Sequence, residues 1–313
     1  MVETWERLIK LFGIRGEQKT FEVGGVKIGG QPGENPTVLI GSIFYRGQKI
    51  VKDETDGTFD RKQAEDLINR QDQLAEETGN PCMIDVVGVS EEALRKYLDF
   101  VSAHTDVPIL LDGGTSANNI AGLQYANESG LIERIVYNSL VPECKQAEID
   151  KIKEVGLRSA VLLALNSRDF TARGRVTAID DLLKRIDGAG IEKPLLDTCV
   201  LDMPTLGQAC QAIVELKSKY GLPAGCGAHN AVSTWKTLKP KFGGKAVEPC
   251  TASADILAIA AGADFILYGP IGTADYVFPA VGMVNAAFAQ IAMERGVKID
   301  KTHPRFRVAQ FRG

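Results

Sequence analysis

Short runs of consecutive apolar residues alternate along this chain with longer segments in which apolar residues recur every three to four positions. The runs are typical of strands buried on both faces, and the longer segments are typical of amphipathic helices. We predict strands at residues 37–45, 82–87, 109–113, 134–138, 160–166, 194–202, 223–230 and 264–269. We predict helices at residues 61–77, 91–102, 117–128, 147–155, 178–186, 206–219, 252–261 and 274–294.

The order of these elements indicates the fold class. Strand and helix alternate along the chain, which indicates an α/β protein with a parallel sheet, and the count of eight pairs favours a closed (β/α)8 TIM barrel. No shift in composition divides the chain, so we expect residues 1–313 to form a single domain. A six-stranded Rossmann-like sheet with extra strands is the alternative.

The first thirty residues precede this alternation. Apolar residues at helical spacing predict a helix from Trp5 to Phe12 that ends at Gly13. The stretch TFEVGGVKIGG then predicts a β-hairpin that turns at Gly24 and Gly25. We expect residues 1–30 to close the bottom of the barrel, with docking of the helix on a membrane surface or a partner as the alternative.

Composition narrows the class of protein. The chain is 44% hydrophobic, which suffices for a large core, and its net charge of −4 with no basic run among aromatic residues argues against a nucleic-acid surface. Six cysteines are scattered without a C-x-x-C pair, as in reduced intracellular proteins. We recognise no apolar stretch that reaches about 18 residues, and no signal peptide. We therefore expect a cytoplasmic protein with no membrane insertion.

The ends of the predicted strands carry the candidate chemistry, because active sites of TIM barrels lie where the carboxyl ends of the strands meet. Carboxylates and amides dominate these ends, at Ser42, Asp85, Asp112, Asn138, Asn166, Asp197 and Asn230. A single aspartate there is often only a helix N-cap, but seven polar strand ends together predict a polar ligand. A carboxylate matches the N–H groups of a 2-aminopyrimidine edge and an asparagine matches a lactam edge, so a pterin ring fits.

Six stretches carry a resemblance to a known family: GGVKIGGQPGENPTVLIGSIFY, ETGNP, LLDGGTS, RIVYNSL, LLDTCVLD and GCGAHNAV. Together they resemble the family of the H subunit of tetrahydromethanopterin S-methyltransferase. The similarity is greatest to its bacterial members, which move methyl groups from a methylated corrinoid protein to tetrahydrofolate, as in the glycine betaine system. The resemblance runs from about Phe21 to the last predicted helix.

The resemblance implies a TIM barrel of the pterin-binding type and roles for single residues. Asp112 in LLDGGTS and Asn138 in VYNSL would hold the pterin ring, and Asp197 would hold the same edge. Asn230 in AHN would approach N5 of the pterin. Asp85 and Asn166 are further candidates for pterin binding, carried over from their positions at strand ends alone.

The resemblance also implies the reaction and the partners. The chain would transfer a methyl group between a methylated corrinoid protein and N5 of tetrahydrofolate by in-line displacement, with Asn230 as the catalytic residue that donates a hydrogen bond to N5. The cobalt-binding motif D-x-H-x-x-G is absent, because His104, His229 and His303 do not fit it. Cobalamin would therefore be carried by a separate corrinoid protein, and we expect no tightly bound cofactor, no metal and a homodimer.

Two alternatives to this function stay within the family. The chain would then be a tetrahydromethanopterin-specific methyltransferase subunit of a larger complex, or a non-catalytic subunit that binds pterin. The upstream methyl donor, glycine betaine or another methylated compound, leaves no mark on the sequence.

A zinc-dependent methyltransferase is a rival interpretation. Cys226 and His229 form one C-x-x-H pair near a predicted strand end, with Cys199 or Cys250 as a third ligand. Zinc requires three or four ligands at fixed spacing, so one pair is a weak signal.

Other barrel chemistries fit less well. Dihydropteroate synthase chemistry shares the pterin pocket but requires cations at the rim, where Lys236 and Lys239 follow no recognisable pattern. No predicted strand ends in the lysine of a Schiff-base aldolase, and the glycine-rich turns lack the Gly-Lys-Ser/Thr ending of a phosphate loop.

Overall fold

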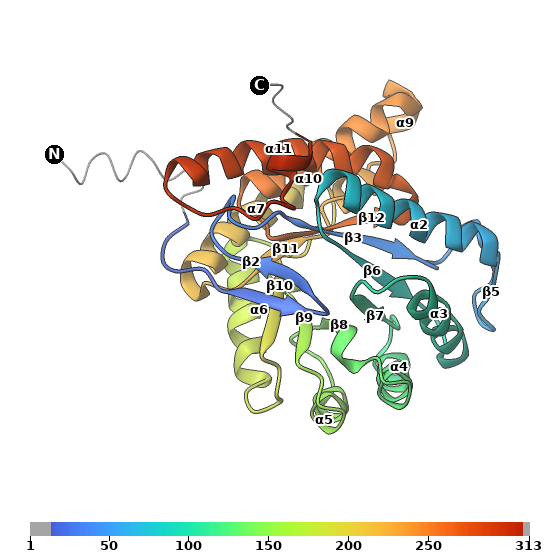
Figure 1. Cartoon of the computed structure of the whole chain (residues 1–313). Helices are drawn as coiled ribbons and strands as arrows, with labels where there is room; N and C mark the ends of the chain where they lie inside the picture. Colours follow the sequence, from blue (N-terminus) through green and yellow to red (C-terminus); the bar gives the residue numbers. More distant parts are fainter. Residues whose placement is uncertain (1–13, 309–313) are drawn as a thin grey trace.

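The computed structural model describes residues 14–308, so the helix predicted from Trp5 to Phe12 lies outside the described residues. Within them, parallel strands form a closed barrel in the order β10, β11, β12, β3, β6, β7, β8, β9 (Figure 1). The barrel strands are β3 (Val38–Ile43), β6 (Cys82–Val87), β7 (Ile109–Asp112), β8 (Ile135–Leu140), β9 (Ser159–Leu163), β10 (Lys193–Asp197), β11 (Ala224–Cys226) and β12 (Phe265–Pro270). The predicted TIM barrel is confirmed.

Helices surround the barrel, and two small hairpins accompany it (Figure 1). The larger helices are α2 (Arg61–Thr78), α3 (Glu91–His104), α4 (Ser116–Glu128), α5 (Gln146–Glu154), α6 (Ala172–Arg185), α7 (Met203–Tyr220), α10 (Val247–Ala260) and α11 (Ala274–Glu294). The short ones are η1 (Ile132–Arg134), α8 (Asn230–Ser233), α9 (Leu238–Phe242), η2 (Gly244–Ala246), η3 (Ile271–Thr273) and α12 (Pro304–Arg307). The hairpins are β1 (Thr20–Val23) with β2 (Val26–Gly29), and β4 (Val51–Asp53) with β5 (Thr58–Phe59).

The alternation of side chains along each strand decides what faces the barrel interior. The lower interior is apolar and contains Val38, Ile40, Met83, Leu110, Val136, Val161, Leu195, Phe265 and Leu267. Two positions further along, the inward residues of β3, β6, β7, β8 and β10 are Ser42, Asp85, Asp112, Asn138 and Asp197. The interior therefore changes from apolar to polar at the carboxyl ends of the strands.

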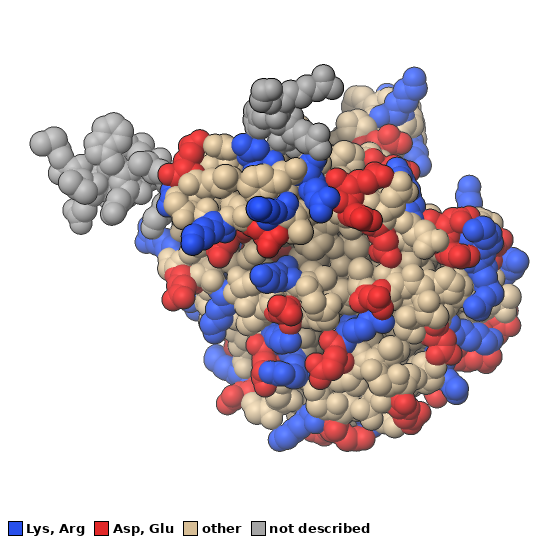
Figure 2. All heavy atoms as spheres, in the orientation of Figure 1, with Lys and Arg blue, Asp and Glu red and all other residues tan. Residues whose placement is uncertain are grey.

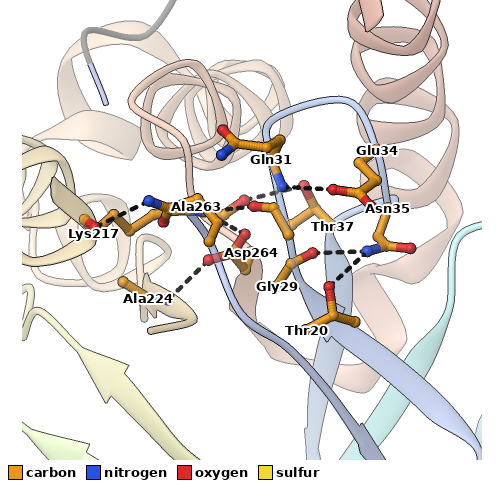
Figure 3. A network of polar contacts seen from close by, with 12 residues as sticks. Thr20, Gly29, Gln31, Glu34, Asn35, Thr37, Lys217, Ala224, Ala263 and Asp264 are labelled. Carbon is orange, nitrogen blue, oxygen red and sulfur yellow. Dashed lines mark hydrogen bonds and ion pairs between the residues drawn. The ribbon is translucent and has the colours of Figure 1, made fainter. Parts of the chain in front are cut away.

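The β1–β2 hairpin closes the opposite end of the barrel, as the sequence predicts. Its Val23 and Ile28 pack into the interior cluster. Beside it lies a buried ion pair, in which Lys217 Nζ is 2.5 Å from Asp264 Oδ1, while the Ala224 N–H donates to Asp264 Oδ2 over 2.9 Å (Figure 3). This polar network connects α7, β11 and the loop before β12.

Four predicted boundaries differ from the structure by four or more residues, and one of them belongs to the strand predicted at residues 194–202, which ends at Asp197. The helix predicted to begin at 178 begins at Ala172, because the Thr171 hydroxyl accepts from the Gly174 N–H and caps it. The helix predicted to begin at 252 begins at Val247. The strand predicted to extend to Asn230 ends at Cys226, and Asn230 instead begins α8.

The segment Ile271–Glu294 corrects the expectation that the chain contains no apolar stretch of membrane-spanning length. It is long and apolar enough to cross a membrane, with a mean hydropathy of 1.4 over its best 18-residue window. Polar residues such as Asp275 and Asn285 interrupt its apolar pattern, so no uninterrupted run marks it. In the fold this segment is a barrel helix that buries Val277, Phe278 and Val281 in the core, so it is weak evidence for a span.

Candidate active site

A hydrogen-bonded cluster occupies one side of the barrel mouth. The Ser42 hydroxyl donates to Asp85 Oδ2 over 2.7 Å, and the Asn138 amide donates to Asp85 Oδ1 over 3.0 Å. These residues come from β3, β6 and β8. Asp112 ends β7, the strand between β6 and β8, so four neighbouring strands supply one cluster.

Burial governs the protonation of this cluster. It raises the pKa of Asp85 to about 7, and the nearby Asp112 carboxylate contributes to the rise, against the two hydrogen bonds from Ser42 and Asn138. Burial also raises the pKa of Asp112, against the hydrogen bond from Gly114. Two carboxyls this close titrate as a pair, so they retain a proton at a higher pH than isolated aspartates do.

The turn after β7 fixes the direction of Asp112. Its Oδ1 accepts from the Gly114 N–H over 3.0 Å, and the Asn119 side chain accepts from the Gly113 N–H over 2.5 Å. A Cβ at Gly113 would lie 2.7 Å from the Asn119 backbone nitrogen, so a larger residue does not fit. Oδ2 of Asp112 accepts no hydrogen bond from residues 14–308 and is accessible to solvent. It is free for a ligand.

Asp197 lies at the end of β10, and burial raises its pKa to about 6 against the opposing charge of Arg175. Its Oδ1 accepts from the Cys199 N–H over 2.7 Å, whereas its Oδ2 has no partner in the described part of the chain and is not sealed from solvent. Asp197 therefore also offers one carboxylate oxygen to a ligand.

Arg175, which is 2% exposed, is a buried charged residue beside the site that the sequence did not reveal. Its guanidinium donates to the carbonyl oxygens of Thr198 and Cys199 over 2.7 and 2.9 Å, and also to that of Phe170. It thus ties the loop after β9 to the loop that follows Asp197. The one indication in the sequence is that Arg175 lies close to the apolar residues of α6. It precedes residue 178, however, and so lies outside the helix that the sequence predicts.

Asn166 is engaged by its own loop. Its Oδ1 accepts from the backbone N–H groups of Arg168 and Asp169 over 3.0 and 3.1 Å, and its amide donates to the Gly174 oxygen over 3.3 Å. This is an Asx-type turn. A contact between Asn166 and a pterin remains a prediction, and the structure brings Asn166 into no contact with the Asp85 cluster.

Asn230 lies at the start of α8, where its amide donates to the Val200 oxygen in the loop after β10 over 3.1 Å. A carboxamide has two N–H groups, so one of them and the side-chain oxygen remain without a partner among the residues that the structure describes. The neighbouring His229 contacts Leu267 O through Nδ1 over 2.9 Å, and burial lowers its pKa. A neutral His229 then carries its proton on Nδ1.

The zinc interpretation finds no ligand set in the part of the chain that the structure describes. No group of three or more His, Cys, Asp and Glu side chains there is arranged to hold a metal ion. Cys226 is fully buried in the core between the barrel and its helices, and burial raises the pKa of its thiol well above the usual value.

Comparison with known sequences identifies relatives over nearly the whole chain. The family model described as tetrahydromethanopterin S-methyltransferase MtrH subunit matches residues 16–300. The H subunit of tetrahydromethanopterin S-methyltransferase from Methanopyrus kandleri is 40% identical over 303 residues, which cover 90% of this chain and 94% of that protein. The H subunit of the putative methyltransferase mtx from Methanosarcina barkeri is 36% identical over 308 residues, which cover 94% and 98%.

Comparison with solved structures supports the fold. Dihydropteroate synthase of Thermus thermophilus in complex with 6HMPPP aligns with a TM-score of 0.58 at 12% identity, covering 86% of this chain and 99% of that one. The Xanthomonas albilineans enzyme with 4-aminobenzoic acid gives 0.58 at 17% identity, covering 86% and 98%. The barrel therefore shares the architecture of these dihydropteroate synthases, and at these identities the likeness concerns the fold alone.

Proposed function

Because the chain belongs to the family of the H subunit of tetrahydromethanopterin S-methyltransferase, we propose that it transfers a methyl group between N5 of a tetrahydropterin and the corrinoid of a separate protein. The observation that carries this proposal is the cluster at the barrel mouth. Asp85, Asp112 and Asn138 lie near the carboxyl ends of three successive strands and present carboxylate and amide groups together. Such a set is complementary to the N–H-rich edge of a pterin ring.

Each residue of the mouth has a role in this proposal. The free oxygens of Asp112 and Asp197 accept N–H groups of the pterin, because each carboxylate has its other oxygen bound to backbone. Asp85 holds the Asn138 amide, which leaves the Asn138 oxygen for a ring N–H. Ser42 fixes Asp85 from the other side.

Methyl transfer is an in-line displacement, for which the corrinoid supplies or accepts the methyl group at its cobalt. The task of the barrel is therefore to hold N5 at a fixed place and angle. The free amide N–H of Asn230 donates to N5 and stabilises the charge that changes there during transfer. Since an amide does not titrate, Asn230 acts by position and electrostatics and not as an acid.

The identity of the pterin is the finer part of the proposal. The relative from Methanopyrus kandleri carries tetrahydromethanopterin in its name, which favours this pterin. Tetrahydrofolate, which the resemblance to bacterial members favours, is the second candidate. Both share the pterin ring that the mouth would bind.

The test is methyl transfer by the purified chain between free methylcobalamin and each of the two tetrahydropterins, with binding measured by calorimetry. We expect turnover with one pterin, and Asn230→Ala should lower that turnover about 100-fold with little change in the dissociation constant, as for removal of one positioned donor. Asn127→Ala, on the exposed far end of α4, is the matched control.

Each other outcome contradicts part of the proposal. Binding of neither pterin would refute it. Pterin binding without transfer, even from the corrinoid protein, would leave a non-catalytic pterin-binding subunit. Full turnover in the Asn230 variant would remove the role of that residue alone.

A further inference from the structure

A separate cavity of about 590 Å³ lies outside the barrel wall, among β12, α8, α9, α10 and the start of α11. Its size falls in the range of about 300–1,000 Å³ that is usual for small-molecule sites. The walls are largely apolar and aromatic, and they include Val232, Trp235, Leu238, Val247, Tyr268 and Tyr276. Nothing in the mechanism above uses this cavity.

The cavity begins at the edge of the barrel mouth. His229, which lines it, directly precedes Asn230. Pro270, which also lines it, pairs in register with Ser42 of β3, whose hydroxyl donates to Asp85. The cavity and the mouth are therefore neighbours at the rim of the barrel.

Two lysines supply positive charge to the lining of the cavity. Lys236 and Lys239 line it, and within the described residues neither ammonium has an ion-pair or hydrogen-bond partner. No aspartate or glutamate is among the described residues that line it. The helix α9 that carries Lys239 projects from the body of the molecule (Figure 1), and Figure 2 shows positively charged side chains at the end of this projection.

A cavity with aromatic walls and two unpaired lysines at its edge suits a ligand in which an aromatic ring carries anionic groups. Tetrahydromethanopterin and tetrahydrofolate both contain such a tail, because the substituent at C6 of the pterin ring continues into an aryl ring and then acidic groups. Aromatic side chains give ring contacts, and lysine gives a mobile point charge for carboxylate or phosphate.

We propose that this cavity binds the aryl and anionic tail of the pterin substrate, with Trp235 and Tyr276 against the ring and Lys236 and Lys239 at the acidic groups. The proposal rests on the proposed function, because it requires a pterin in the barrel mouth. In this proposal α8 and α9 contact the tail of the pterin, and the barrel mouth contacts its ring.

The test compares full pterins with 6-methyltetrahydropterin, which lacks the tail, by calorimetry on the full chain. The wild type should bind tetrahydromethanopterin or tetrahydrofolate at least about tenfold more tightly than the tailless compound, as expected for two partly exposed ion pairs and ring contacts. K236Q/K239Q should lose about tenfold in affinity for the full pterin and leave the tailless affinity unchanged. K241Q, on the same helix but outside the cavity lining, is the control.

The outcomes for the tail site and for the proposed function are distinguishable. Equal affinity of the wild type for full and tailless pterins would overturn the tail site and leave pterin binding intact. Binding of neither would refute both proposals. In K236Q/K239Q, an equal loss of affinity for the full and the tailless pterin would also overturn the tail site. A loss of methyl transfer from the corrinoid protein with unchanged pterin affinity would overturn it too, and would instead indicate a docking surface for that protein.

Discussion

At the scale of single residues, the pair of Asp85 and Asp112 decides which charge the barrel mouth carries. Asp85 positions the Asn138 amide by accepting its N–H, and Asp112 accepts from the ligand, so both carboxyls act in their ionised form, while burial raises the pKa of both. Pterin binding should therefore strengthen as the pH rises through about 7, the pKa of Asp85, and weaken below it.

Asp112→Asn tests this coupling. The asparagine oxygen can keep the bond from Gly114, but the carboxylate for the ligand is lost, so affinity for 6-methylpterin should fall about 10- to 100-fold. Because one negative charge next to Asp85 is removed, the pKa of Asp85 should fall from about 7, and the pH midpoint of the remaining binding should move down with it. Calorimetry between about pH 5 and pH 8 measures both effects.

6-Methylpterin is oxidised and lacks the basic N5 of the tetrahydropterins. The pH midpoint of its binding therefore reports titration of the protein and not of the ligand. Asp66→Asn, whose carboxylate lies on the exposed face of α2 beside Lys62, should change neither affinity nor midpoint. An unchanged midpoint in Asp112→Asn would show that the two carboxyls do not interact.

At the scale of elements, one buried side chain holds the loops at the ends of β9 and β10. Arg175→Met should lower the free energy of unfolding by about 3 kcal/mol, because the Thr198 and Cys199 oxygens lose their buried donor. The pKa of Asp197 should rise above about 6, since an opposing positive charge is gone, and pterin binding should require a higher pH.

Two further variants separate charge from structure. Arg175→Lys keeps the charge but not all of the hydrogen bonds, so it should restore the pH profile more fully than the stability. Arg173→Met, on the exposed side of the same helix, should alter neither. A stability loss in Arg175→Met without any shift in the pH profile would confine Arg175 to a structural role.

The same element shows what could be predicted from the sequence. Strand positions followed from apolar runs, and the inward direction of Asp85 and Asp112 follows from strand alternation with no further information. The structural role of Arg175 did not, because a charged residue in a helical segment looks solvent-exposed until its tertiary partners are known.

The amides illustrate the same limit at two strand ends. Asn166 and Asn230 look alike in the sequence, yet their side-chain oxygens differ in the structure. The Asn166 oxygen accepts from two backbone N–H groups of its own loop, whereas the Asn230 oxygen has no partner in the described chain. The hairpin β4–β5 has no counterpart in the sequence prediction, because two- and three-residue strands leave almost no periodic pattern.

At the scale of the whole molecule, the candidate ligand site and the hairpin that closes the barrel lie at opposite ends of the barrel. The mouth contains carboxylates with free oxygens, whereas the bottom is sealed by the hairpin and by the Lys217–Asp264 pair, in which Lys217 is 1% exposed (Figure 3). Burial raises the pKa of Asp264, and Lys217 opposes that shift. A change at the bottom should consequently affect stability without affecting the ligand site.

Lys217→Met tests this separation. Removing one partner of a buried ion pair leaves an uncompensated charge, so the free energy of unfolding at neutral pH should fall by about 3–5 kcal/mol. The loss should be smaller near pH 4, because the pKa of Asp264 rises further in the folded variant and protonation of the buried carboxyl then removes the uncompensated charge. Denaturant unfolding at both pH values measures it.

Lys217→Met/Asp264→Asn is the matched rescue, since the amide oxygen still accepts from the Ala224 N–H and no charge remains buried. It should recover most of the stability and remove the dependence on pH. Pterin affinity at a temperature where each variant is folded should equal that of the wild type. Weaker pterin binding in the rescued double variant would show that the bottom of the barrel is coupled to the mouth through its apolar interior.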